Sequence, residues 1–135
     1  MRRGDSRTEL RSLFDGPLGP LRHSSLFLYL DADWNEDLPL AEEFKIVYSR
    51  CPAAVVMIDD FEVPGDPGYG FDDYGPGKAL NAPYIDPAVR AHELAVFYPS
   101  TPSAKESGAH RGCVVLCNKA VHGATLASIP LLRCP

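Results

Sequence analysis

Residues 26–31 read Leu-Phe-Leu-Tyr-Leu-Asp, and residues 53–60 read Ala-Ala-Val-Val-Met-Ile-Asp-Asp. Each segment is an unbroken apolar run that stops abruptly at an acidic residue. Runs that are apolar on both faces are typical of interior strands of a parallel sheet, because both faces of such a sheet are covered. Residues 39–50 lie between them and carry apolar side chains at helical spacing. This order predicts two adjacent parallel strands joined by a right-handed helical crossover.

Two further helices are predicted on either side of this unit. Residues 8–14 have apolar residues at helical spacing, and Ser6 or Thr8 is the candidate N-cap. Residues 86–94 form the second predicted helix, with Asp86 as N-cap and a proline at the first helical position.

The remaining apolar runs predict a hairpin at the edge of the sheet. Residues 96–98 and 112–117 are apolar, and the polar connection between them is short enough for an antiparallel pair. Residues 62–87 form a long connection rich in proline, glycine and aromatic residues, which is typical of functional loops. The tail from Asn118 has no clear pattern. The sequence therefore predicts one α/β domain with parallel strands and an antiparallel edge hairpin.

Composition excludes several classes of function. The chain has 135 residues, of which 45% are hydrophobic and 23% charged, as in ordinary globular domains. The net charge of −5 argues against a nucleic-acid surface. No apolar run approaches the ~20 residues of a membrane span, and the N-terminus has no signal-peptide core, so we expect a cytoplasmic protein without membrane contact. The four cysteines are expected to be buried reduced thiols.

The acidic strand ends are the candidate functional site. Asp31, Ala32 and Asp33 follow the first strand, and Asp59 and Asp60 follow the second. In open α/β sheets ligands bind at the carboxyl ends of the strands, so both clusters should share one edge. Carboxylates gathered there repel each other unless a cation offsets the charge, and Mg²⁺ suits one or two carboxylates with substrate oxygens. The alternative is that these aspartates cap the helices or turns that follow.

The two acidic segments carry a family resemblance. Residues 30–34 (Leu-Asp-Ala-Asp-Trp), followed by residues 58–61 (Ile-Asp-Asp-Phe), resemble the ends of strands four and five in class I S-adenosylmethionine (SAM)-dependent methyltransferases. The likeness is closest to catechol-type O-methyltransferases and to sugar O-methyltransferases of macrolide biosynthesis. It implies that Asp31, Asp59 and Asp60 bind Mg²⁺, which holds the hydroxyl oxygens of a small-molecule acceptor.

Other segments extend the resemblance from residue 4 to about residue 118. Residues 63–67 (Val-Pro-Gly-Asp-Pro) look like the loop after strand five in the catechol enzymes. Residues 4–7 resemble the turn that approaches the adenine of SAM, which implies that Asp5, Ser6 and Trp34 bind the cofactor. Residues 96–117 fit the family's last two strands. The implied fold is a partial Rossmann-like methyltransferase sheet.

The sequence also departs from the family. The strand and Gly-x-Gly turn that hold the methionine part of SAM, and the acid for its ribose, should precede residue 4. We therefore expect a partial domain in which activity of the 135 residues alone is doubtful. Asn35 stands near the place of the catechol enzymes' catalytic lysine, which leaves Asp33 as the candidate base. The aromatic loop 69–84 would cover the site, or simply pack on the sheet.

Two other functions compete with methyl transfer. The Asp-Ala-Asp sequence at residues 31–33 also resembles the DxD motif of GT-A glycosyltransferases, which would leave Asp59 and Asp60 unexplained. A non-catalytic remnant or interaction module is the other alternative. A partial sheet exposes the edge of its first strand, which invites self-association or a completing partner chain.

Overall fold

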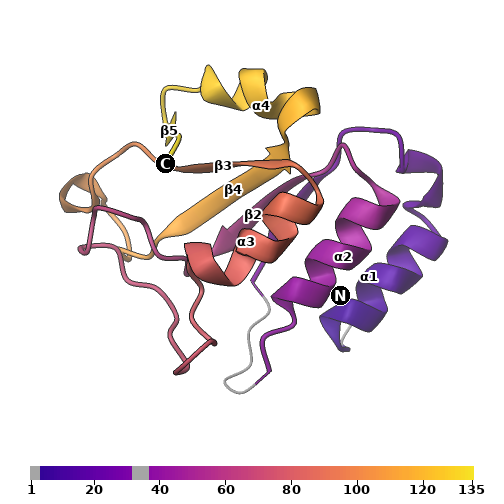
Figure 1. Cartoon of the computed structure of the whole chain (residues 1–135), viewed down its shortest axis with the longest axis horizontal. Coiled ribbons are helices and arrows are strands. Elements are labelled where there is room, and N and C mark those ends of the chain that lie inside the picture. The colour runs from indigo at the N-terminus through magenta and orange to yellow at the C-terminus, as the bar shows by residue number, and fades with distance from the viewer. Residues whose placement is uncertain (1–3, 32–36) are drawn as a thin grey trace.

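The computed structural model describes residues 4–31 and 37–135 of the chain. The candidate base Asp33 and the candidate cofactor contact Trp34 lie outside the described residues. The chain forms a five-stranded sheet with three helices on one side and a fourth on the other (Figure 1). The strands are β1 (Phe27–Leu30), β2 (Val55–Asp59), β3 (Leu94–Pro99), β4 (Cys113–Asn118) and β5 (Leu132–Arg133). The helices are α1 (Ser6–Asp15), α2 (Leu40–Arg50), α3 (Ala82–Ala91) and α4 (Lys119–Ala127), with 3₁₀ turns η1 (Gly19–Leu21) and η2 (Ser103–Lys105).

The sheet is mixed, with the strand order β1-β2-β4-β3-β5. β1 and β2 are adjacent and parallel, and α2 connects them, which confirms the prediction of a parallel pair joined by a helix. β3 and β4 are antiparallel, also as predicted. β4 lies between β2 and β3 and pairs antiparallel with β2, so the hairpin is built into the sheet, and β5 extends its far edge.

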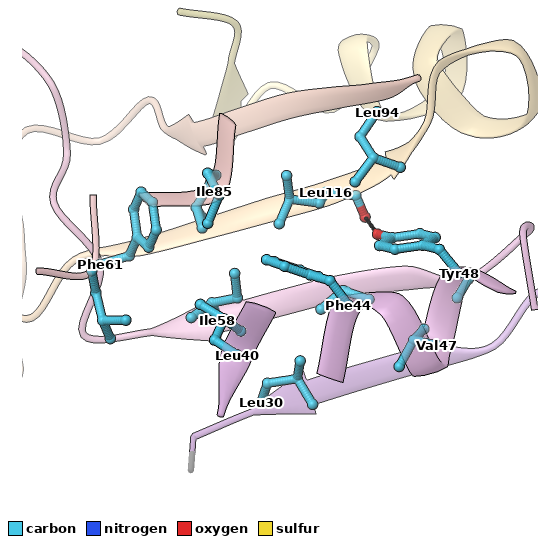
Figure 2. Close-up of a cluster of buried hydrophobic side chains, with 14 of the residues drawn as sticks. Leu30, Leu40, Phe44, Val47, Tyr48, Ile58, Phe61, Ile85, Leu94 and Leu116 are labelled. Carbon is cyan, nitrogen blue, oxygen red and sulfur yellow. Dashed lines mark hydrogen bonds between the residues drawn. The ribbon is translucent and has the colours of Figure 1, made fainter. Parts of the chain in front are cut away.

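The main core lies between the sheet and the layer formed by α1, α2 and α3 (Figure 2). Phe44 and Val47 of α2 are almost fully buried against Val56 of β2 and Leu116 of β4. The Tyr48 hydroxyl donates a hydrogen bond to the Leu116 carbonyl at 3.3 Å, so its polar end is satisfied inside the core. Burial of each large apolar side chain contributes about 1.5–3 kcal/mol, and this cluster therefore holds the helix layer on the sheet.

The N-cap of helix α1 lies one residue before Ser6 and three before Thr8, the two predicted caps. The Asp5 carboxylate accepts hydrogen bonds from the Arg7 and Thr8 amides, so Asp5 is the N-cap. A carboxylate is favoured there because it satisfies free amides and faces the positive end of the helix.

Helix α3 also begins before the predicted position, so the prediction of an Asp86 cap is wrong. The Asn81 side chain accepts the Tyr84 amide at 3.1 Å and caps the helix, while Pro83 occupies the first turn. Pro87 consequently lies inside α3. The unassigned tail forms α4, capped by the side chain of Asn118.

No helix among the described residues is long and apolar enough to cross a bilayer. The expectation of buried thiols is met by Cys51 and Cys117, whereas Cys113 is half-buried and Cys134 is exposed. Burial raises the pKa of the Cys117 thiol to about 11, so this group is protonated and unreactive at neutral pH.

Candidate functional site

The acidic residues lie where β1 and β2 end. Leu30 pairs with Ile58 in parallel register, so Asp31 and Asp59 leave the sheet side by side. Asp60 follows with φ of +53°, in the left-handed region, and its carbonyl accepts the Asp72 amide at 2.9 Å. Asp72 belongs to the β2–α3 loop and was not among the predicted residues. These four residues (Asp31, Asp59, Asp60 and Asp72) form what we call the acidic edge.

The carboxylates of the acidic edge repel one another. Partial burial, and then the negative charges of Asp59, Asp60 and Asp72, raise the pKa of Asp31 above the usual value of an aspartate. The pairing of Leu30 with Ile58 supports the prediction that the two strand ends lie side by side.

Arg111 is the cation that the described structure places on this edge. Its Nε contacts Asp60 and its Nη2 contacts Asp72, and these hydrogen bonds raise its pKa further above the ordinary arginine value. Arg111 stands just before β4, whose first residue, Cys113, pairs with Asp59. The antiparallel register of β4 with β2 thus places the Arg111 guanidinium at the carboxyl end of β2.

Tyr29 of β1 contacts Asp59, the other acidic residue at the end of β2. Its hydroxyl donates a hydrogen bond to Asp59, and that carboxylate raises the tyrosine pKa well above its usual value. The part of the alternative in which these acids cap the following helices is wrong for Asp59 and Asp60, whereas capping of turns stays untested. The N-cap of α2 is Pro39 without a side-chain bond, and that of α3 is Asn81.

The side chains as arranged do not fit a bound Mg²⁺. Among the described residues, no three His, Cys, Asp or Glu side chains are placed to hold a metal ion. Asp60 is engaged by Arg111 and Asp59 by Tyr29, whereas Mg²⁺ requires near-octahedral oxygen ligands. The predicted ligands Asp31, Asp59 and Asp60 therefore share one edge without forming a coordination site.

The candidate cofactor residues have local structural roles. Asp5 caps α1 and pairs with Arg7, which also pairs with Asp37 at 2.8 Å. Ser6 is the first residue of α1.

A small cavity lies at the acidic edge beneath the strand ends. Its volume is about 10 Å³, room for about one water molecule. It is lined by Leu30, Leu38, Leu40, Glu43, Ile58, Asp59 and Leu80. It is far too small for SAM.

The β2–α3 loop is packed rather than free over the site. The Tyr69 side chain is buried, and its hydroxyl donates to the Thr101 carbonyl and to Glu106, both at 2.9 Å. Tyr69 thus points toward the β3–β4 connection, which favours the packing alternative for this aromatic residue. Tyr74 lies nearer the acidic edge and donates to Asp72 at 2.6 Å.

Replacement of Asp31 tests the repulsion within the acidic edge. An aspartate with a raised folded-state pKa weakens the folded state while ionised, above that pKa, and the penalty disappears as the pH falls below the unfolded value. Asp31→Asn should therefore raise the Tm slightly at neutral pH, and the difference from wild type should vanish in acid. Asp86→Asn, which breaks an exposed ion pair with Arg90, is the control and should not raise the Tm at either pH. A lower Tm for Asp31→Asn at neutral pH would show that Asp31 is held by favourable contacts instead.

A comparison of the sequence with known protein families finds no match, and neither a curated protein nor a solved structure matches the chain.

Proposed function

We propose that the chain is the acceptor-binding part of a SAM-dependent methyltransferase that transfers a methyl group to a hydroxyl of a small molecule. The single observation that carries the proposal is the convergence of acidic residues at the carboxyl ends of the parallel pair β1–β2. This is the edge where open α/β sheets bind ligands. The order of elements is also the one that the resemblance implies, namely a parallel pair with a helical crossover and then an antiparallel pair.

Methyl transfer from SAM requires little chemistry from the acidic edge itself. The sulfonium methyl group of SAM is already activated, so a protein mainly aligns it with the acceptor oxygen. Carboxylates at the acidic edge would accept hydrogen bonds from acceptor hydroxyls and draw off a proton as the oxygen attacks. The metal-assisted form of the proposal requires Arg111 to leave Asp60 and Asp72, because the guanidinium now neutralises them.

A magnesium titration followed by NMR tests the metal-assisted form. Arg111→Gln should bind Mg²⁺ at least tenfold more tightly than wild type, because it removes the competing cation and leaves the carboxylates in place. Asp59→Asn should bind Mg²⁺ more weakly than wild type, and Asp86→Asn on α3 should match it. Amide resonances of Asp59 and Asp60 should shift as Mg²⁺ is added. If Arg111→Gln and wild type bind equally, or neither binds, the metal-assisted form is wrong.

A second titration addresses the acceptor. Catechol is the probe, because it presents two adjacent hydroxyl groups. It should shift the resonances around Asp59 and Asp60 in wild type and less in Asp59→Asn. Shifts confined to other parts of the chain would remove the acidic edge from the proposal, whatever the outcome with Mg²⁺.

A non-catalytic interaction module is the second candidate function. It is favoured by β1, which pairs only with β2 within the described part of the chain. The Leu26 carbonyl faces β2, where it accepts the Val55 amide at 2.8 Å. Because successive residues of a strand point their backbone groups to opposite sides, Phe27 and Tyr29 present theirs at the open edge. Protection of these two amides from hydrogen exchange on adding a partner would support this function, and its absence would count against it.

A further inference from the structure

Helix α2 carries an acidic residue on the face that packs against the sheet. Leu40, Phe44 and Val47 belong to the buried stripe of this helix, and Glu43 lies within the stripe, in the first turn. Glu43 is 1% exposed, and no other Asp or Glu among residues 4–31 and 37–135 is buried. Glutamate is rarely buried to this degree, because its ionised form loses the surrounding water. The proposed methyl transfer does not use this side chain.

Glu43 lies beneath the acidic edge. It lines the cavity of about 10 Å³ at the carboxyl ends of β1 and β2, and Asp59 is the other acidic residue of that lining. The remaining lining residues are leucine or isoleucine, and Figure 2 shows three of them, Leu30, Leu40 and Ile58, gathered at this end of the sheet. The cavity has room for about one water molecule, which would contact both acidic residues. A proton on Glu43 would therefore have a path through one water to the acidic edge.

Two effects act against a negative charge on Glu43, and they have the same sign. The leucine and isoleucine side chains around the cavity cannot replace the water that stabilises a carboxylate. The acidic edge repels further negative charge, and Asp59 brings that repulsion to the cavity itself. Both effects favour the protonated form of Glu43.

The titratable groups that α1 and α3 bring to the start of α2 have bonds of their own. Burial, and then the charge that Glu43 carries once ionised, raise the pKa of Tyr84 of α3, so these two side chains lie close together. The Tyr84 hydroxyl donates to the Leu38 carbonyl at 3.1 Å. The arginines of α1 pair with exposed carboxylates, namely Arg7 with Asp5 and Asp37, and Arg11 with Glu42. On the cavity side, the acidic neighbour of Glu43 is Asp59.

We propose that Glu43 holds a proton in the folded chain and releases it when negative charge on the acidic edge is neutralised. The acidic edge and the buried carboxyl group then act as one proton-coupled site, because positive charge added above the cavity lowers the cost of ionising Glu43. A cationic ligand bound at the edge would exchange with the Glu43 proton, which passes through the cavity water to solvent. The inference concerns the edge used in the proposed function, but it needs neither SAM nor Mg²⁺ and is tested without them.

Carbon-13 labelling of the glutamate side chains locates the proton by NMR. In wild type, the Glu43 carboxyl group should keep its proton to a higher pH than the exposed Glu42 in the same turn. Asp59→Asn removes one carboxylate from the acidic edge and should raise the acid dissociation constant of Glu43 on the order of tenfold. Asp86→Asn, which breaks an exposed ion pair on α3, should leave the Glu43 titration where it is in wild type.

The pH dependence of stability gives a second readout, whose sign differs between the two protonation states. In the unfolded chain, Glu43 should ionise above about pH 4.3. If the folded chain keeps the proton, folding takes up one proton above that pH, so wild type loses stability relative to Glu43→Gln as the pH rises. The folding equilibrium constant of Glu43→Gln divided by that of wild type should grow by up to about tenfold per pH unit between about pH 5 and 7. Glu42→Gln is the matched control and should show no such growth.

Three outcomes would overturn the proposal: a Glu43 that titrates together with Glu42, a stability ratio for Glu43→Gln that falls as the pH rises, or a Glu43 titration that Asp59→Asn does not move. The first two would show that Glu43 is ionised in the folded chain and held by favourable contacts. The third would show that its proton is not coupled to the acidic edge. The NMR titration needs no change at Glu43, so it decides the question even if Glu43→Gln does not fold.

Discussion

Equilibrium dialysis with labelled SAM is expected to find little or no binding to the 135-residue chain. The cavity lined by Leu30, Ile58 and Asp59 at the carboxyl ends of the strands has a volume of about 10 Å³, far too small for SAM. The one implied cofactor carboxylate in that part of the chain, Asp5, already caps α1 and pairs with Arg7. The groups that the resemblance assigns to the methionine and ribose parts of SAM would precede residue 4.

The size of the effect follows from the missing polar contacts. Each net hydrogen bond contributes about 1 kcal/mol, and bonds to charged groups contribute more. A few such contacts correspond to at least a hundredfold in affinity, since about 1.4 kcal/mol is a factor of ten. Asp5→Ala serves as the check. Micromolar binding by wild type that is lost in Asp5→Ala would show that the 135 residues suffice for SAM binding and that Asp5 contacts the cofactor.

The parallel unit was predictable because its signal is local and redundant. Residues 26–30 and 53–58 are apolar throughout, and a helical period lies between them. The same pattern indicated that both faces would be covered, yet Phe27 and Tyr29 are half exposed or more. The described part of the chain therefore leaves one face of β1 exposed, which the apolar pattern alone did not predict.

Other features depend on long-range register, which the sequence does not display. Arg111 reaches Asp60 and Asp72 only because β4 inserts between β2 and β3 and starts where β2 ends. In the sequence alone, Arg111 is an isolated arginine in a polar segment. Helix α4 was missed for a different reason, since its few polar residues, Lys119, His122 and Thr125, are spread along Lys119–Ala127 and leave only a weak amphipathic pattern.

Gly112→Ala should lower the free energy of unfolding by roughly 3 kcal/mol, because this site has no room for a methyl group. A Cβ there would lie 2.1 Å from the Phe61 carbonyl oxygen and 2.8 Å from Cγ2 of Val63. The Phe61 oxygen belongs to the backbone and cannot change rotamer to make room. Gly112 also accepts the Phe61 amide and donates to the Gly70 carbonyl, both at 2.9 Å. The substitution therefore pushes apart the start of β4 and both anchored points of the β2–α3 loop.

The matched variant is Gly108→Ala in the same connection, where a Cβ would meet nothing within 4 Å. It should change stability by no more than about 0.5 kcal/mol, whereas Gly112→Ala should lower the Tm by about 10 °C. Hydrogen exchange adds a local readout, since the Phe61 amide should exchange faster in Gly112→Ala if it still folds. The loop positions Asp60 and Asp72 through the same contacts, so the variant should also disturb the acidic edge. Equal thermal stability of the two variants would mean that β4 does not begin in contact with Phe61. The register that places Arg111 at the carboxyl end of β2 would then be wrong.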